Sequence, residues 1–136
     1  MKKTRLTFAA TVTVAAAAAI WGVQALNAQQ PGFKRVELQD KDLSVQGRHV
    51  VQARAEFVPG GAIGKHTHPG EEVSYVLEGA LQLEVEGQPT RTLKAGESFF
   101  IPAGAVHAGK NVDKGTTKVL ATYIVEKGKP VATPVK

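Results

Sequence analysis

Four residues in the middle of the chain have the types and spacing of metal ligands: His66, His68, Glu72 and His107. Side chains two apart on an extended strand point to the same side, so His66 and His68 converge while Thr67 turns away. Imidazole nitrogens and carboxylate oxygens suit divalent first-row metals. The pattern therefore predicts a metal site with three imidazoles and one carboxylate.

The carboxylate is expected to reach the imidazoles through a turn. Pro69-Gly70 breaks the histidine strand, and the β-favouring run 73–77 can then pair antiparallel with that strand. Such a hairpin would return Glu72 to a position beside the imidazoles. Glu71 is the alternative ligand. Because adjacent strand residues face opposite sides, only one of the two carboxylates points inward, and spacing alone does not choose between them.

A second stretch of the chain supplies the third imidazole. Residues 98–101 are predicted to form a buried strand and residues 102–104 a tight turn, with His107 at the start of the next extended segment. Three of the four histidines of the chain therefore lie at ligand positions. The fourth, His49, falls on the inward face of an earlier strand, and we interpret it as a residue that begins this strand.

Both stretches resemble the two sequence motifs of the cupin superfamily. The first motif is Gly, five residues, His-x-His, three or four residues, Glu, six residues, Gly, and it is matched by Gly60, His66, His68, Glu72 and Gly79. The second is Gly, five residues, Pro-x-Gly, two residues, His, three residues, Asn, and it is matched by Gly96, Pro102, Gly104, His107 and Asn111. The resemblance covers residues 57–111 by motif and 36–125, more loosely, by strand pattern.

The resemblance implies a small, single-domain bacterial cupin with an all-β fold, the double-stranded β-helix or jelly-roll barrel. It implies Glu72, and not Glu71, as the ligand that joins His66, His68 and His107. It also implies a likeness to the quercetin dioxygenase-like group. In such a protein the metal holds substrate oxygens and dioxygen side by side, and Glu72 would act as ligand and proton acceptor.

The strand pattern indicates the same fold class. Residues 48–58 and 81–86 alternate apolar and polar side chains, which is typical of strands with one solvated face. Further strands are predicted over residues 90–93, 99–101, 106–108 and 118–125. The last of these is almost continuously apolar and is expected to be buried on both faces. Short strands separated by Gly and Pro turns, with no convincing helical period, indicate an antiparallel sandwich or barrel.

The N-terminus has the layout of a secretory signal peptide. Lys2, Lys3 and Arg5 precede a mildly apolar stretch, residues 6–23, and small residues follow it. An uncleaved membrane anchor is the alternative, since about 18 apolar residues can span a bilayer. The stretch is rich in alanine and threonine and only weakly hydrophobic, so we expect export, to the periplasm or into the medium.

Cleavage is expected after Ala25 or Ala28. The signal peptide then covers residues 1–28, and a single domain covers residues 29–136. Within this domain we expect a core over residues 36–125 and a flexible or arm-like tail over residues 127–136.

Composition argues against several classes of function. A chain of 136 residues suits one domain. Its formal net charge of +5 falls to +2 when the three bases of the signal peptide are removed. No basic patch with interleaved aromatic residues is present, so nucleic acid is not an expected partner. The chain has no cysteine, which excludes disulfides and thiolate ligands.

The predicted ligand set favours a working metal centre. Iron, manganese, nickel, copper and zinc all suit it, and the sequence does not choose among them. Four protein ligands around an octahedral ion leave two positions for water, dioxygen or a chelating substrate, whereas closed structural zinc sites usually contain cysteine. Phe57, either Phe99 or Phe100, and Ile101 are expected to line the pocket, which favours a flat aromatic or enediol compound.

Three functions remain open at this point. The first is a metal-dependent, dioxygenase-like oxidoreductase that acts on a small oxygen-chelating aromatic or enediol compound, with Glu72 as the catalytic residue. The second is a protein that binds or senses a metal or small molecule without turnover. The third is an isomerase, which needs a further acid or base from Tyr75 or Tyr123, and Tyr75 has the wrong strand parity relative to Glu72.

The length of the mature chain also bears on assembly. So small a domain buries only an intermediate fraction of its surface by itself. We therefore expect a homodimer, formed by pairing of exposed edge strands.

Overall fold

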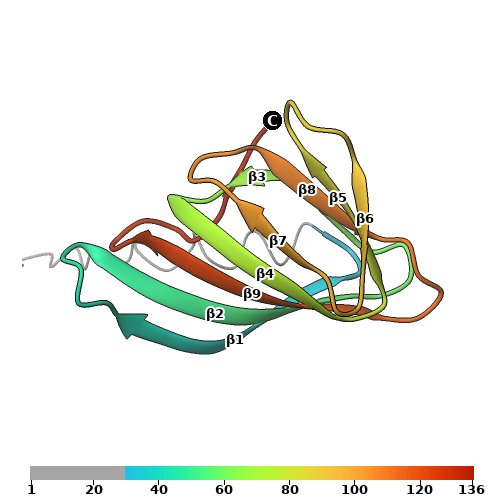
Figure 1. Cartoon of the computed structure of the whole chain (residues 1–136), viewed down its shortest axis with the longest axis horizontal. Coiled ribbons are helices and arrows are strands. Elements are labelled where there is room, and N and C mark those ends of the chain that lie inside the picture. The colour runs from blue at the N-terminus through green and yellow to red at the C-terminus, as the bar shows by residue number, and fades with distance from the viewer. Residues whose placement is uncertain (1–29) are drawn as a thin grey trace, which may run out of the picture.

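The computed structural model describes residues 30–136 (Figure 1), and the predicted signal peptide lies outside these residues. No helix among the described residues is long and apolar enough to cross a lipid bilayer. The strands are β1 (Phe33–Asp42), β2 (Arg48–Phe57), β3 (Ala62–Thr67), β4 (Gly70–Glu78), β5 (Ala80–Val85), β6 (Arg91–Lys94), β7 (Ser98–Ile101), β8 (His107–Asn111), β9 (Thr117–Glu126) and β10 (Thr133–Pro134).

These strands form two antiparallel sheets. The first sheet has the order β1-β2-β9-β4-β7, and the second has the order β10-β3-β8-β5-β6. Figure 1 shows the long strands of the first sheet running side by side as one layer, with β3, β8, β5 and β6 in the other layer. The prediction of an all-β, two-sheet barrel is confirmed.

Strand alternation decides which side chains enter the barrel. On β9, and on β2 from Val51 onward, every second residue is buried and the intervening residues are half-buried. The expectation that residues 118–125 are buried on both faces is therefore wrong. The apolar outer residues of β9 belong to a sheet face that no second layer covers within the described part of the chain.

The first strand, β1, has no counterpart among the strands expected from the sequence. Its charged and polar side chains do not alternate with apolar ones, so the period-two signal is absent. In the structure β1 is the edge of the first sheet and pairs with β2, with Phe33 opposite Phe57. Charged side chains are common on edge strands because they discourage pairing with other chains.

The turn at Pro69 and Gly70 carries the chain from one sheet to the other. The expectation that the strand after this turn pairs with the histidine strand is wrong. The histidine strand β3 pairs with β8 and β10, whereas β4 pairs with β7 and β9. A Cβ atom on Gly70 would lie 2.0 Å from the carbonyl oxygen of Ile124 on β9, so only glycine permits this approach. Glu72 therefore faces the imidazoles from the opposite sheet.

The C-terminal segment, residues 127–136, folds back along the second sheet. Its strand β10 pairs antiparallel with β3, with Pro134 opposite His66. The backbone N–H of Val135 donates a hydrogen bond to the carbonyl of Lys65 at 2.9 Å. The segment predicted to be a flexible or arm-like tail is therefore an arm fixed beside the histidine strand.

Candidate metal centre

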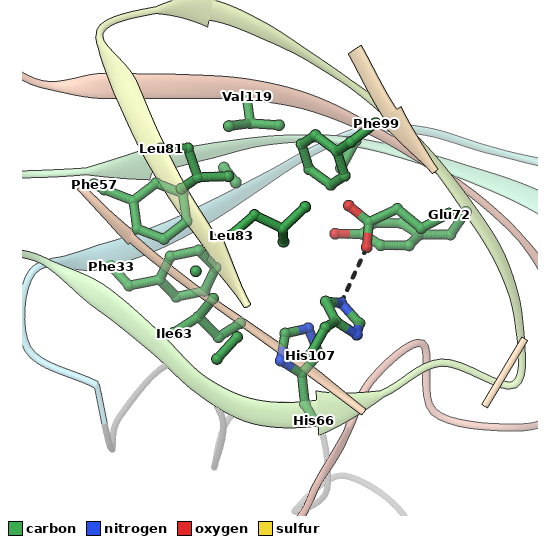
Figure 2. Close-up of a pocket in the computed structure, with 15 residues that line it drawn as sticks. Phe33, Phe57, Ile63, His66, Glu72, Leu81, Leu83, Phe99, His107 and Val119 are labelled. Carbon is green, nitrogen blue, oxygen red and sulfur yellow. Dashed lines mark ion pairs between the residues drawn. The ribbon is translucent and has the colours of Figure 1, made fainter. Parts of the chain in front are cut away.

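All four predicted ligands lie together inside the barrel. His66 is near the end of β3 and is paired directly with His107 at the start of β8, while His68 follows β3 and Glu72 comes from β4. Each of the four residues is at most 5% exposed. Figure 2 shows His66, His107 and Glu72 with their nitrogen and oxygen atoms gathered at one end of a pocket.

The structure also shows where the other acidic candidate, Glu71, and the fourth histidine, His49, lie. Glu71 faces outward, and its Oε2 lies 3.9 Å from Arg48 Nη1. Glu72 is the next residue of β4 and faces inward, because adjacent residues of a strand point to opposite faces. His49 is near the start of β2, where its Nδ1 lies 2.7 Å from Asp40 Oδ1. Only Glu72 of these three joins the imidazoles.

The three imidazoles of the site are close enough to share one ion. One ring nitrogen from each of His66, His68 and His107 lies within 4.8 Å of the other two. Oε2 of Glu72 lies 3.0 Å from His68 Nε2 and 3.3 Å from His107 Nε2. The hydroxyl of Ser74 donates to the other carboxylate oxygen of Glu72 at 2.5 Å, which fixes the orientation of the carboxylate.

Each imidazole is oriented by a backbone carbonyl that contacts its Nδ1. The carbonyls of Gly64, Val131 and Ala105 lie 2.8, 2.5 and 3.0 Å from Nδ1 of His66, His68 and His107 respectively. A carbonyl oxygen only accepts hydrogen bonds, so Nδ1 carries the proton and Nε2 of the neutral ring keeps a lone pair. This tautomer binds metals through Nε2.

Burial and mutual proximity set the charges of the site. Burial, and then the neighbouring His107, lower the pKa of His66 to about 4, so His66 is neutral near pH 7. Burial by itself would raise the pKa of Glu72. The Ser74 hydroxyl opposes this effect, because it donates a hydrogen bond to the carboxylate and so favours the ionised form.

The arrangement fits a divalent cation. Nε2 of His68 and Nε2 of His107 are buried and have no hydrogen-bond partner among the described residues. Both face the ionised oxygen of Glu72 at 3.0 and 3.3 Å. Lone pairs and an anionic oxygen at this spacing repel one another unless a cation lies among them. The three buried histidines could therefore bind a metal ion, and their nitrogens suit a first-row metal.

A pocket with a cavity volume of about 40 Å³ extends from these residues into the apolar half of the barrel. Phe99 lines this pocket and Phe100 is 54% exposed, which resolves the alternative that the sequence left open. Figure 2 shows the apolar wall opposite the polar end. Its large apolar side chains are those of Phe33, Phe57, Ile63, Leu81, Leu83, Phe99 and Val119.

Tyr123 is a further pocket residue whose orientation the sequence left open. It lies on β9 directly opposite Glu72, and its ring centroid is 4.7 Å from that of His68. Burial, and then the charge of Glu72, raise the pKa of Tyr123 far above its usual value, so it remains a neutral phenol. Tyr75 faces outward and is 45% exposed. The β4–β9 register, which no local pattern reveals, decides that Tyr123 faces the site.

Comparisons with known proteins agree with the motifs. Residues 53–123, more than half of the chain, match a family model described as the cupin domain. A germin-like protein, subfamily 2 member 2, of Arabidopsis thaliana is 42% identical over 76 residues, which are 52% of this chain and 35% of that protein. The dimethylsulfoniopropionate lyase DddQ of Ruegeria pomeroyi is 39% identical over 49 residues, which are 36% of this chain and 24% of the lyase.

A solved structure has the same fold. Oxalate oxidase in complex with the substrate analogue glycolate superposes with a TM-score of 0.61 and 28% identity, over 75% of this chain and 54% of the oxidase. This chain thus spans about half the length of that oxidase and about a third or less of the two curated relatives. The matched domain, the two motifs and the shared fold show that the chain belongs to the cupin family.

Proposed function

We propose that this protein is a metal-dependent enzyme that acts on a small oxygen-chelating compound, with dioxygenase-like oxidation as its first candidate reaction. The observation that carries the proposal is the pair of buried Nε2 lone pairs, on His68 and His107, that face the Glu72 carboxylate at one end of an apolar pocket. Its similarity to proteins named oxalate oxidase and dimethylsulfoniopropionate lyase supports an enzymatic role.

Each residue of the site has a distinct role in this proposal. His66, His68 and His107 would hold the ion, and Glu72 would complete the ligand set. The bound metal supplies a Lewis acid and open positions for oxygen ligands. Glu72 also offers a carboxylate that can accept a substrate proton, and Ser74 holds this carboxylate in place.

The pocket supports a small, flat substrate. Its aromatic and aliphatic walls exclude water from the reacting atoms, which strengthens every electrostatic contact at the polar end. Its cavity volume of about 40 Å³ is far below that of sites for drug-sized ligands, so only a small molecule fits. Aromatic and enediol compounds with neighbouring oxygens match this shape and the metal-binding end.

The first experiment tests metal binding and turnover together. The protein is loaded separately with iron, manganese, nickel, copper and zinc, and oxygen uptake is measured with flavonols, catechols, β-diketones and oxalate. Turnover is expected with at least one combination of metal and substrate. It should be lost in His107→Ala and in Glu72→Gln. His49→Ala is the matched control, since this histidine lies outside the site, and it should retain both metal and activity.

The possible outcomes separate the candidate functions. If the wild-type protein retains none of these metals after dialysis, the metal centre itself is rejected. If the protein retains metal but no combination of metal and substrate consumes oxygen, the dioxygenase-like reaction is rejected. A ligand-induced rise in melting temperature without product would then support the binding or sensing function.

The inward position of Tyr123 favours a second candidate, proton transfer without dioxygen, as in an isomerase. Tyr123 lies directly opposite Glu72, so a hydroxyl donor and a carboxylate base share one face of the sheet. Anaerobic incubation of a substrate in deuterated water should then introduce deuterium into it, and Tyr123→Phe should abolish the exchange. Substrate that stays free of deuterium would exclude this candidate.

We also propose that the protein acts after export and as a homodimer. The basic and apolar layout of residues 1–28 supports export. The outer face of the first sheet supports self-association, because it carries four large apolar side chains that are 45–54% exposed. They are Val73, Tyr75, Leu77 and Phe100.

A further inference from the structure

Two inward positions next to the candidate ligands carry unusually small side chains. Gly109 is the next inward residue after His107 on β8, and Ala121 is the inward residue before Tyr123 on β9. Both small residues are buried and line the pocket. They belong to opposite sheets, so they leave space on both sides of the pocket, one step from its polar end.

The wall around this space is apolar. Leu83 is directly opposite Gly109 in the β5–β8 ladder, and Val119 is the next inward residue of β9 beyond Ala121. Figure 2 shows Leu83 and Val119 in the part of the pocket away from the histidine nitrogens. Apart from the candidate ligands and Tyr123, every residue that lines the pocket is glycine, alanine or a larger apolar residue.

This composition limits the chemistry of a bound molecule. A charged group in the apolar part of the pocket would lose its water and gain no partner, which is strongly unfavourable. An alkyl group would instead be stabilised by leaving water. The end of a ligand that lies away from the metal ligands is therefore expected to be uncharged and apolar.

The size of the space limits the length of that apolar end. The cavity volume is about 40 Å³. A single water-sized sphere needs about 10–15 Å³ of such volume, so the cavity has room for roughly three of them. A chain of about three carbon atoms matches this room, whereas the fused rings of a flavonol exceed it.

The backbone does not require glycine at position 109. The φ angle of Gly109 lies outside the left-handed region that favours glycine. A Cβ atom built there would lie 3.4 Å from Leu81 Cδ1 and 3.6 Å from Ile63 Cγ2, which are ordinary contact distances. An alanine would therefore fold in the same way and would only occupy space in the pocket.

We propose that Gly109 and Ala121 are specificity-determining residues, which admit a short, uncharged aliphatic end of the substrate and limit its length. This inference rests on the proposed function and narrows its substrate class to small oxygen chelators with such an end. The contrasting arrangement is one in which the small residues serve only the packing of the barrel. The two arrangements differ in whether binding depends on the length of the ligand.

The test uses hydroxamates, which bind metals through two oxygens, on the metal-loaded, full-length protein. Butyrohydroxamate has two more methylene groups than acetohydroxamate and should bind about tenfold more tightly. Octanohydroxamate, which exceeds the cavity, should lose this gain. Succinic monohydroxamate has a chain similar to that of butyrohydroxamate but ends in a carboxylate, and it should bind no more tightly than acetohydroxamate.

Two variants narrow the pocket from opposite sheets. Gly109→Ala and Ala121→Val should each reduce the preference for butyrohydroxamate to about twofold or less, with acetohydroxamate binding unchanged. Gly115→Ala is the matched control, because Gly115 is exposed and a Cβ atom there would meet no atom within 4 Å. This control should keep the full preference.

The dissociation constant of the metal is measured first for each protein. A wild-type protein that takes up no metal, or whose metal binds no hydroxamate, contradicts the proposed function itself. Three results with intact metal binding overturn only the present inference: equal affinity for acetohydroxamate and butyrohydroxamate, affinity that continues to rise with octanohydroxamate, or a full preference retained in both narrowed variants.

Discussion

At the scale of single residues, the candidate metal centre depends on atoms that do not touch the ion. The carbonyl of Val131 and the hydroxyl of Ser74 fix the proton position of His68 and the orientation of Glu72. Contacts of this kind typically change metal affinity by about 10- to 100-fold when they are lost. Tyr123 is another such neighbour, because it packs against His68 and faces Glu72.

The raised pKa of Tyr123 has a consequence for alkaline stability. The unfolded chain loses its tyrosine protons near pH 10, at about the reference value, while the folded protein keeps the Tyr123 proton. The unfolded state then binds fewer protons, so the free energy of unfolding falls as the pH rises through this value. Tyr123→Phe should lose less stability than the wild type between about pH 9.5 and 11.5.

Urea unfolding of the metal-free protein at several pH values measures this difference. Tyr75→Phe is the matched control for loss of a hydroxyl at an exposed position. Equal losses of stability in the wild type and in Tyr123→Phe would show that the phenol is not held in its protonated form by the fold.

At the scale of elements, the side chain of Asn111 links strands that are far apart in the sequence. Its side-chain amide donates to the carbonyls of Phe57, Val58 and Gly115 at 3.0, 3.0 and 2.8 Å. Its side-chain oxygen accepts from the Thr117 hydroxyl at 2.7 Å. One buried amide thus connects the end of β8 with the end of β2 and the start of β9.

Asn111→Leu should therefore destabilise the barrel. The substitution keeps the approximate volume but leaves several buried carbonyls without a donor, which costs about 3 kcal/mol or more. Chemical unfolding of the variant measures the change, with Val112→Ala as an exposed neighbouring control. A loss below about 1 kcal/mol would mean that water replaces these hydrogen bonds.

The C-terminal arm is the second element with a role at the site. Removal of residues 129–136 deletes both β10 and the Val131 carbonyl that orients His68. We expect metal affinity to fall by about 10- to 100-fold while the two main sheets remain folded. Isothermal titration with one metal and far-ultraviolet circular dichroism measure the two properties.

A shorter truncation separates the two contributions of the arm. Removal of residues 133–136 deletes β10 and keeps Val131, so its loss of affinity should be smaller. If the longer truncation binds metal as tightly as the full chain, the arm does not position His68.

At the scale of the whole molecule, the outer face of the first sheet has the composition of an interface. Val73 lies between Phe100 on β7 and Thr122 on β9, and Tyr75 lies beside Leu120. Ion pairs flank this apolar centre at Arg48–Glu71 and Lys118–Glu78. An apolar centre with a charged rim is typical of protein interfaces.

The size of this face suits a second copy of the chain. The five strands of this sheet have ten, ten, ten, nine and four residues and lie about 4.8 Å apart, so the face covers roughly 700 Å². A standard interface buries about 800 Å² on each partner. Two copies related by a two-fold axis would present the same patch to each other, which differs from the edge-strand pairing expected from the sequence.

Phe100→Glu should therefore convert the proposed dimer to a monomer, since it places a charge at the apolar centre of the face. Val112→Glu is the matched control, because Val112 is similarly exposed, at 47%, and follows β8 in the other sheet. Analytical ultracentrifugation measures the mass of each protein. A dimer that persists in Phe100→Glu would exclude this face, and a monomeric wild type would exclude the dimer.

The sequence by itself determined the fold class and the identity of the candidate ligands. Alternation along a strand is a local property, so the spacing of His66 and His68 predicts their common direction. The two motifs add His107 and select Glu72, and the frequent turns indicate an all-β barrel. The comparisons confirm the family, while the signal peptide and the bound metal remain predictions.

Only the tertiary structure decided which elements meet at the site. It showed that Glu72 arrives from the opposite sheet, that Tyr123 faces the same interior, and that the C-terminal arm contacts His68. The physical reason is that strand pairing and register join residues far apart in the chain, so no short pattern encodes them. The Val131 carbonyl is a backbone group that any residue would carry, and its position next to His68 exists only in the folded chain.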